Sequence, residues 1–246
     1  MNVLIVVAHP DTGSFNHALV DAAKARFTAE GHEVRVRDLY ASGFRPLATA
    51  ADFADVVEEG EGFALDVLQQ RQADAGAVPE DIRADIDLIE WCDLLVLQFP
   101  IWWFSAPAIL KGWFERVLFK GIAYGGGRKH GSGVFAGRHG LVSCTTGTPD
   151  STYAPDGIEG DIERLLWPVN NGIFHYLGMT PYRPFVSYAP RSMDDAGRAA
   201  ELTRFAEYVG QLDGRNELPM HPESDYGEDH RLRPDVVPRS GFQYRD

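Results

Sequence analysis

Three short segments, each directly after an apolar run, contain the groups that could do chemistry. The first is HPDTGSFNHAL, residues 9–19. Within it Ser14 and Asn16 are spaced to cap a helix, whose N-terminal N–H groups and dipole would favour a phosphate. The segment contains neither G-x-G-x-x-G nor G-x-x-x-x-G-K-(S/T), which excludes the two common phosphate-binding loops. A helix cap without a ligand would use the same residues.

The other two segments are FPIWWFSAP, residues 99–107, and TTGTPDSTY, residues 145–153. Glycine and small hydroxylated residues in the latter let the backbone approach a flat ligand with its N–H groups, although a plain turn would have a similar composition. Trp102, Trp103 and Phe104 in the former could be core residues under a loop. Beside two loops rich in donors, these rings instead predict the walls of a pocket for a planar aromatic ligand.

Apolar runs alternate along the chain with segments of helical periodicity, which predicts an α/β fold with a parallel sheet and helices on both faces. In such a sheet ligands bind beyond the carboxyl ends of the strands, so the three segments should converge. From residue 214 onward the chain is polar and rich in proline, which predicts a domain over 1–213 and a tail over 214–246. The expected strands are 3–8, 32–39, 94–99, 140–145 and 180–187, and the expected helices lie at 15–30, within 50–90, and at 106–119, 160–178 and 194–212.

Composition limits the possible partners and location. The chain has 246 residues, 44% of them hydrophobic, and a formal net charge of -13, which argues against general affinity for nucleic acid or anionic membranes. No apolar stretch approaches the roughly 20 residues of a membrane helix, and the first residues lack a cationic leader. Cys92 and Cys144 have no metal-ligand spacing and predict buried free thiols in a cytoplasmic protein without a metal site.

Four longer segments carry a family resemblance: VLIVVAHPDTGSFNHAL, LQFPIWWFSAPAILKGWFERVL, SCTTGTPDSTYAPDGIEGD and LLWPVNNGIFHYLG. In order and spacing they resemble the NAD(P)H:quinone oxidoreductase (DT-diaphorase) family of flavoproteins over roughly residues 1–210. The resemblance implies a flavodoxin-like, doubly wound sheet of five parallel strands and a homodimer with active sites at its interface. It also implies bound FAD rather than FMN, and ping-pong hydride transfer from NADPH or NADH to quinones or to other flat acceptors such as azo and nitro compounds.

The same resemblance assigns roles to individual residues. It places Tyr153 at the active site as a catalytic tyrosine, and Tyr124 in the substrate pocket of the opposite subunit, where Trp103, Phe104 and Gly147 would also meet the substrate. Arg198 loosely matches an arginine near the adenine dinucleotide portion. The flavin would be bound at its phosphates and ribityl chain by His9, Ser14, Phe15 and Asn16, along its ring by Pro100, Ile101, Trp102, Trp103 and Phe104, and at its polar edge by Thr145, Thr146, Gly147, Thr148 and Tyr153.

The sequence departs from the family pattern at two places. Glu159, in GIEGD, stands where the family has a histidine that relays protons with the tyrosine. We expect Glu159 either to be partly protonated and to relay a proton, or to face solvent while Tyr153 acts alone. The loop GGGRKHGSG has glycine in place of a second pocket tyrosine, which predicts a wider pocket. Two alternatives remain open: a redox-sensing regulatory subunit that docks to a transporter such as a potassium-efflux system, and an FMN-containing electron carrier.

Overall fold

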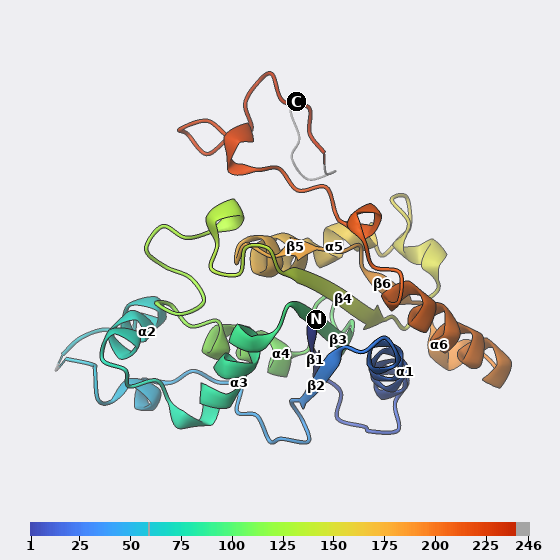
Figure 1. Cartoon of the computed structure of the whole chain (residues 1–246), viewed down its shortest axis with the longest axis horizontal. Coiled ribbons are helices and arrows are strands. Elements are labelled where there is room, and N and C mark those ends of the chain that lie inside the picture. The colour runs from blue at the N-terminus through green and yellow to red at the C-terminus, as the bar shows by residue number, and fades with distance from the viewer. Residues whose placement is uncertain (59, 240–246) are drawn as a thin grey trace.

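A parallel sheet organises the chain in the computed structural model, which describes residues 1–58 and 60–239 (Figure 1). The strand order is β2-β1-β3-β4-β5, the doubly wound order expected for a flavodoxin-like fold. All strand pairs are parallel. The strands are β1 (Asn2–Val7), β2 (Glu33–Asp38), β3 (Leu94–Pro100), β4 (His139–Thr145), β5 (Thr180–Pro181) and β6 (Phe185–Ser187).

The fifth strand position is divided. We expected one strand over 180–187, but β5 and β6 each pair separately with β4. Pro184 lies between them and has no backbone N–H to donate to a ladder, which explains why regular pairing is not continuous there. The central strand agrees with its apolar sequence, because every residue of β3 is buried between β1 and β4.

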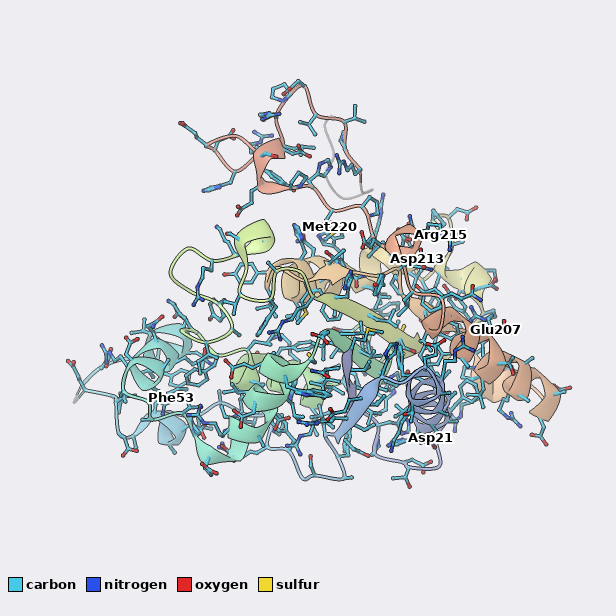
Figure 2. The ribbon with its side chains drawn as sticks, viewed as in Figure 1. Asp21, Phe53, Glu207, Asp213, Arg215 and Met220 are labelled. Carbon is cyan, nitrogen blue, oxygen red and sulfur yellow. The ribbon has the colours of Figure 1, made fainter. Side chains whose placement is uncertain are left out.

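Helices cover both faces of the sheet (Figure 1). On one face, α1 (Phe15–Ala29) and α6 (Asp195–Val209) bury residues such as Phe27 and Phe205 against β1. Their outer sides carry the exposed residues Asp21 and Glu207 (Figure 2). The other core lies under α2 (Leu65–Asp74), α3 (Glu80–Trp91), α4 (Ala108–Val117) and α5 (Ile162–Val169).

A buried ion pair joins three elements on this second face. The carboxylate of Asp85 on α3 is fully buried and accepts two hydrogen bonds of 2.7 Å from the guanidinium of Arg37 on β2. The indole Nε1 of Trp113 on α4 donates to the same carboxylate at 2.9 Å. The buried charge is therefore both paired and hydrogen-bonded, as a charge without solvent must be.

The helix predicted over 160–178 changes geometry partway. After α5, which contains Pro168, the chain continues as a wider π-helical segment over Asn170–His175. Such segments are rare and are found often at functional sites. This one directs Asn171 and His175 toward one cavity and Ile173 toward a different groove.

The segment after α6 extends away from the body of the domain (Figure 1). It is attached at its start, where the Leu218 N–H donates to the Pro181 carbonyl at 2.8 Å. Met220 lies just beyond this attachment (Figure 2). Farther on, His221 is buried and hydrogen-bonds to Asp225 at 2.7 Å. Short 3₁₀ turns at Gly214–Asn216 and Glu223–Asp225 are its regular structure within the described part of the chain.

The two cysteines are buried and free, which confirms the prediction of unpaired thiols. Burial raises the pKa of Cys92 to about 12 and raises that of Cys144 as well, so both thiols stay protonated near neutral pH. Neither thiol is therefore activated as a nucleophile.

Candidate active site

The loop after β1 forms the N-terminus of α1, as its sequence predicts. Ser14 caps the helix with an extended backbone, and its hydroxyl accepts a hydrogen bond from the His17 N–H. The Gly13 N–H donates to the Asp11 carboxylate at 2.9 Å, which closes the turn before the cap. The first-turn N–H groups of Phe15 and Asn16 have no acceptor among the described residues, as is usual where a helix begins.

A buried chain of amide and hydroxyl groups joins this loop to two others. The Gln98 Nε2 group at the end of β3 donates to Asn16 Oδ1 at 2.9 Å. The Asn16 Nδ2 group in turn donates to Thr145 Oγ1 at the end of β4, at 3.1 Å. Because all three side chains are buried, the chain fixes the loops after β1, β3 and β4 relative to one another.

A fourth loop, after β6, joins the same edge of the sheet. The Thr146 N–H donates to the Ser187 carbonyl at 3.1 Å, and the Ala189 N–H donates to Thr146 Oγ1 at 3.3 Å. Ala189 has a left-handed backbone with φ of 46°. Such a conformation is costly for alanine and persists only where the surroundings impose it. The turn that follows brings Arg191 to the rim of the site.

The aromatic loop is a tight two-residue turn. Trp102 and Ser105 exchange backbone hydrogen bonds of 3.0 and 3.1 Å, and between them Trp103 and Phe104 have φ of 50° and 60°. Positive φ at both central positions is typical of turns that favour Asn-Gly, so two large aromatic residues are unusual here. Their side chains face outward, because Trp103 is 96% exposed and Phe104 is 51% exposed in the protomer.

These four loops enclose one cavity of about 410 Å³. The cavity gathers most of the residues that the resemblance assigns to the flavin, and their contact with a flavin stays a prediction. Asp11, Pro190 and Arg191 were not predicted. Because the carboxyl ends of parallel strands share one edge, the loop after the last strand could have been included on the same argument. The lining residues are His9, Asp11, Ser14, Phe15, Asn16, Pro100, Ile101, Trp102, Thr145, Thr146, Gly147, Pro190 and Arg191.

Trp103, Phe104, Thr148, Tyr153 and Arg198 do not line this cavity. Thr148 is close by, because its carbonyl accepts a hydrogen bond of 2.7 Å from the hydroxyl of a lining residue, Thr146. The Arg198 guanidinium donates to the Met193 carbonyl and pairs with Asp195 at 2.5 Å, so it is held on the first turn of its own helix. Its contact with the cofactor stays a prediction.

Tyr153 and Glu159 belong to one folded loop. Tyr153 is buried, and its ring centroid lies 6.0 Å from that of Tyr188. Burial raises the pKa of Tyr188 to about 12, so this neighbour is a neutral hydroxyl group. The Glu159 N–H donates to the Thr152 carbonyl at 2.9 Å, which folds the GIEGD segment back onto the turn that carries Tyr153.

Tyr124 lies in a separate, mostly apolar groove of about 260 Å³. Its ring packs edge-on against Tyr176 at 5.9 Å, and burial raises the pKa of its phenol. Phe114, Leu118 and Ile173 are among the other lining residues. Tyr124 is therefore not among the residues that line the 410 Å³ cavity at the strand ends.

Within residues 1–58 and 60–239, no group of three or more His, Cys, Asp or Glu side chains is arranged to hold a metal ion. Over the same residues, no helix is long and apolar enough to cross a membrane.

Comparisons with known proteins agree with the geometry. A family model described as a flavodoxin-like fold matches residues 1–209. The chain is 39% identical over 186 residues to NAD(P)H dehydrogenase (quinone) 1 of Rattus norvegicus, covering 76% of this chain and 68% of that protein. It is 35% identical over 217 residues to the ribosyldihydronicotinamide dehydrogenase (quinone) of Pongo abelii, covering 88% and 94%.

A solved structure gives the same result. A Klebsiella pneumoniae protein assigned as a quinone reductase superposes with a TM-score of 0.91 at 33% identity, covering 98% of this chain and 96% of that one. The resemblance seen in the sequence and the predicted fold are both confirmed. The chain belongs to the family of flavodoxin-like NAD(P)H:quinone oxidoreductases.

Proposed function

We propose that the protein is a flavin-dependent oxidoreductase that transfers two electrons from NADPH or NADH to quinones or similar flat acceptors by a ping-pong mechanism. The observation that carries the proposal is the cavity at the carboxyl ends of the strands, whose lining includes the N-terminus of α1 and the Trp102 ring. The printed names of the rat and Pongo abelii relatives, both quinone dehydrogenases, support the same reaction class.

The residues present fit a flavin with a phosphate at the start of α1. The free N–H groups of Phe15 and Asn16 and the helix dipole supply the anion site. Gly147 leaves open space where a side chain would stand, since a Cβ placed there has no atom within 4 Å. A flat ring can therefore approach the backbone at this point. We take the cofactor to be FAD, with FMN as the alternative.

A bound flavin would supply the redox chemistry by accepting a hydride from the donor and passing it to the acceptor. The residues of the chain would hold the flavin ring and stabilise the negative charge that develops at its polar edge. The Thr146 N–H is already bonded to Ser187, so the N–H groups of Gly147 and Thr148 are the donors for that charge. One such donor is worth roughly 2.7–4 kcal/mol in oxyanion holes of other enzymes.

The aromatic turn that carries the lining residue Trp102 also exposes two large rings. Trp103 and Phe104 are large apolar side chains that face solvent in the protomer, and we propose that a second copy of the chain packs against them. The groove of Tyr124 and Tyr176 would provide the opposite wall for the stacked nicotinamide or quinone. Stacking between the two walls would hold the reacting groups at close range and would exclude water from the space between them.

We propose that the Tyr153 hydroxyl provides a proton at the polar edge of the ring. The segment that carries Glu159 folds back onto the same turn, so Glu159 either relays a proton with Tyr153 or faces solvent while Tyr153 acts alone. A Glu159→Gln variant distinguishes these two roles. If Glu159 relays protons, the pH profile of flavin reduction should change in this variant. An unchanged rate at every pH would remove Glu159 from the mechanism and leave Tyr153 to act alone.

An anaerobic stopped-flow experiment on the purified protein tests the proposed function. NADH or NADPH should bleach the flavin rapidly, menadione should restore its colour, and the mass of the released flavin should identify FAD. A protein that binds flavin but is hardly bleached by either nucleotide would refute the enzyme proposal and favour the regulatory alternative. A cytoplasmic location stays a prediction based on the two free thiols.

A further inference from the structure

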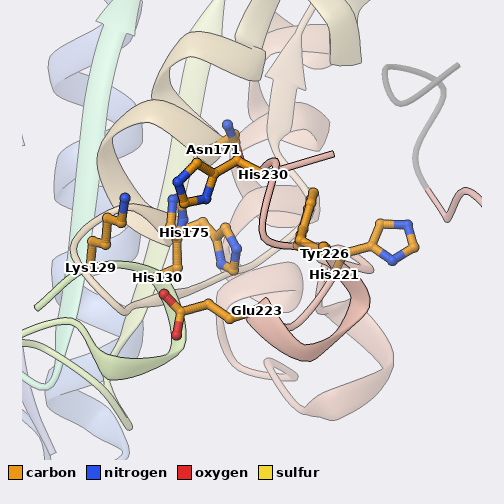
Figure 3. A pocket seen from close by; sticks show the side chains of 9 residues that line it. Lys129, His130, Asn171, His175, His221, Glu223, Tyr226 and His230 are labelled. Carbon is orange, nitrogen blue, oxygen red and sulfur yellow. The ribbon is translucent and has the colours of Figure 1, made fainter. Parts of the chain in front are cut away.

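A second large cavity, of about 440 Å³, is lined by a different set of residues (Figure 3). Three segments far apart in the sequence form it: the loop at 129–130, the π-helical segment, and the tail. Its volume is in the range of small-molecule sites. The lining residues are Lys129, His130, Asn171, His175, His221, Glu223, Tyr226, Gly227 and His230, none of which belongs to the flavin cavity.

The backbone is strained where it borders this cavity. His130 and His230 have left-handed backbones, with φ of 49° and 59°. The other non-glycine residues with positive φ in the described part of the chain are Trp103, Phe104 and Ala189, all in loops of the proposed active site. Strain of this kind clusters at functional sites, because elsewhere selection has no reason to retain it.

The tail that closes the cavity is fixed by a buried side chain. His221 Nδ1 lies 2.7 Å from the Asp225 carboxylate, and His221 Nε2 accepts a hydrogen bond of 2.8 Å from the Arg239 N–H. Across the cavity, the His130 N–H donates to the Tyr176 carbonyl at 2.9 Å. Both walls are therefore anchored independently of any ligand.

Two neutral imidazole rings and two ionic side chains line the cavity. Burial lowers the pKa of His175 to about 4 and lowers that of His130, so both imidazoles are uncharged near pH 7. Their ring centroids are 5.0 Å apart. His130 Nδ1 is buried without a hydrogen-bond partner among the described residues, which leaves a polar atom for a ligand to satisfy. Lys129 and Glu223 supply one positive and one negative charge (Figure 3).

We propose that this cavity binds an adenosine phosphate whose ribose carries free hydroxyl groups. Imidazole and phenol rings can stack on a flat base, and an asparagine amide such as that of Asn171 can pair with N6 and N7 of adenine. A carboxylate accepts hydrogen bonds from ribose hydroxyls, which gives Glu223 its role. The Lys129 ammonium would hold the phosphates. The Glu223 carboxylate would repel a 2′-phosphate.

The cavity adjoins the groove proposed for the substrate. The His130 ring packs edge-on against Tyr176 at 5.5 Å, and Tyr176 packs against Tyr124 in the groove. An adenosine phosphate here is therefore either a free nucleotide or the adenosine half of the hydride donor whose nicotinamide lies in the groove. The second source rests on the proposed function and predicts a preference for NADH over NADPH.

Calorimetric titration of ADP into the flavin-loaded protein tests the proposal, because a filled flavin cavity cannot take the probe. ADP should bind the wild type more tightly than 2′,5′-ADP does. Lys129→Ala should weaken ADP binding by about 10-fold or more, since charged hydrogen bonds carry this magnitude. Glu223→Gln should bring the two probes close to equal affinity. The control is Lys24→Ala, an exposed lysine on α1, which should bind ADP as the wild type does.

Steady-state kinetics separates the two sources. If the site holds the donor, Lys129→Ala should raise KM for NADH about 10-fold and leave KM for dihydronicotinamide riboside, which lacks the adenosine half, unchanged. If ADP binding weakens and neither KM changes, the site holds a free nucleotide. Wild-type protein that fails to bind ADP, or variants that bind it equally well, would overturn the proposal. Failure of every donor to reduce the flavin would instead refute the proposed function, and the ADP titration would still decide this inference.

Discussion

The aromatic turn makes a quantitative prediction about strain. A left-handed backbone costs a non-glycine residue roughly 1–2 kcal/mol. Replacing Trp103 by glycine removes that cost but adds about 0.5–1 kcal/mol of chain entropy to the unfolded state. Since the Trp103 side chain is 96% exposed, it contributes no burial within the protomer. Trp103→Gly should therefore have a free energy of unfolding about 0.5–1 kcal/mol higher than a variant that also lacks the ring but keeps the left-handed cost.

Trp103→Ala is the matched control. It removes the same ring and keeps the left-handed cost, so the difference between the two variants measures the strain whether or not a second subunit covers the ring. Urea unfolding of the flavin-free protein, followed by circular dichroism, measures both variants. The titration should be repeated at several protein concentrations, because a second subunit that buries Trp103 would make the midpoint depend on concentration. If Trp103→Gly is no more stable than Trp103→Ala, the strain argument is wrong.

The same two variants separate stability from function. Both lose the aromatic ring that we propose meets the acceptor, and aromatic stacking contributes about 0.5–1.5 kcal/mol beyond burial. The KM for menadione should therefore rise by about 2- to 10-fold in both variants. A normal KM in both would show that Trp103 does not touch the acceptor.

Three further predictions concern the scaffold and the second cavity. Thr145→Val removes the acceptor of Asn16 Nδ2 and should lower the free energy of unfolding by about 1–3 kcal/mol, whereas unchanged stability in urea would contradict the proposed link between loops. Asp85→Asn leaves Arg37 without its counter-charge and should cost about 3–5 kcal/mol in the same assay; a loss below 1 kcal/mol would refute the buried pair's importance. Folding lowers the pKa of His175 from 6.5 to about 4, so between these two pH values the unfolded chain binds more protons than the folded protein. The free energy of unfolding should therefore fall as the pH drops from 6.5 to about 4. Thermal melts of His175→Gln should show a shallower slope over that range, and an unchanged slope would assign the effect elsewhere.

Local sequence patterns predict the sheet well because strand burial is a local property. The run at 94–97 identified the central strand, and its full burial follows from lying between two parallel neighbours. The position of the cavity at the strand ends could also be predicted from the sequence, because the loops that follow parallel strands share one edge of the sheet. The break between β5 and β6 was missed, although Pro184 offered a signal for it.

The sequence by itself determined the family, the order of elements and most of the residues that line the cavity at the strand ends, because these depend on periodicity and on segments next to strand ends. Only the tertiary structure decided that Arg191 borders this cavity and that Lys129, Asn171 and Glu223 border another. It also decided that Trp103 faces outward in a strained turn. These features depend on contacts between residues distant in the chain and on φ values that neighbouring loops impose, and no local pattern encodes either of them.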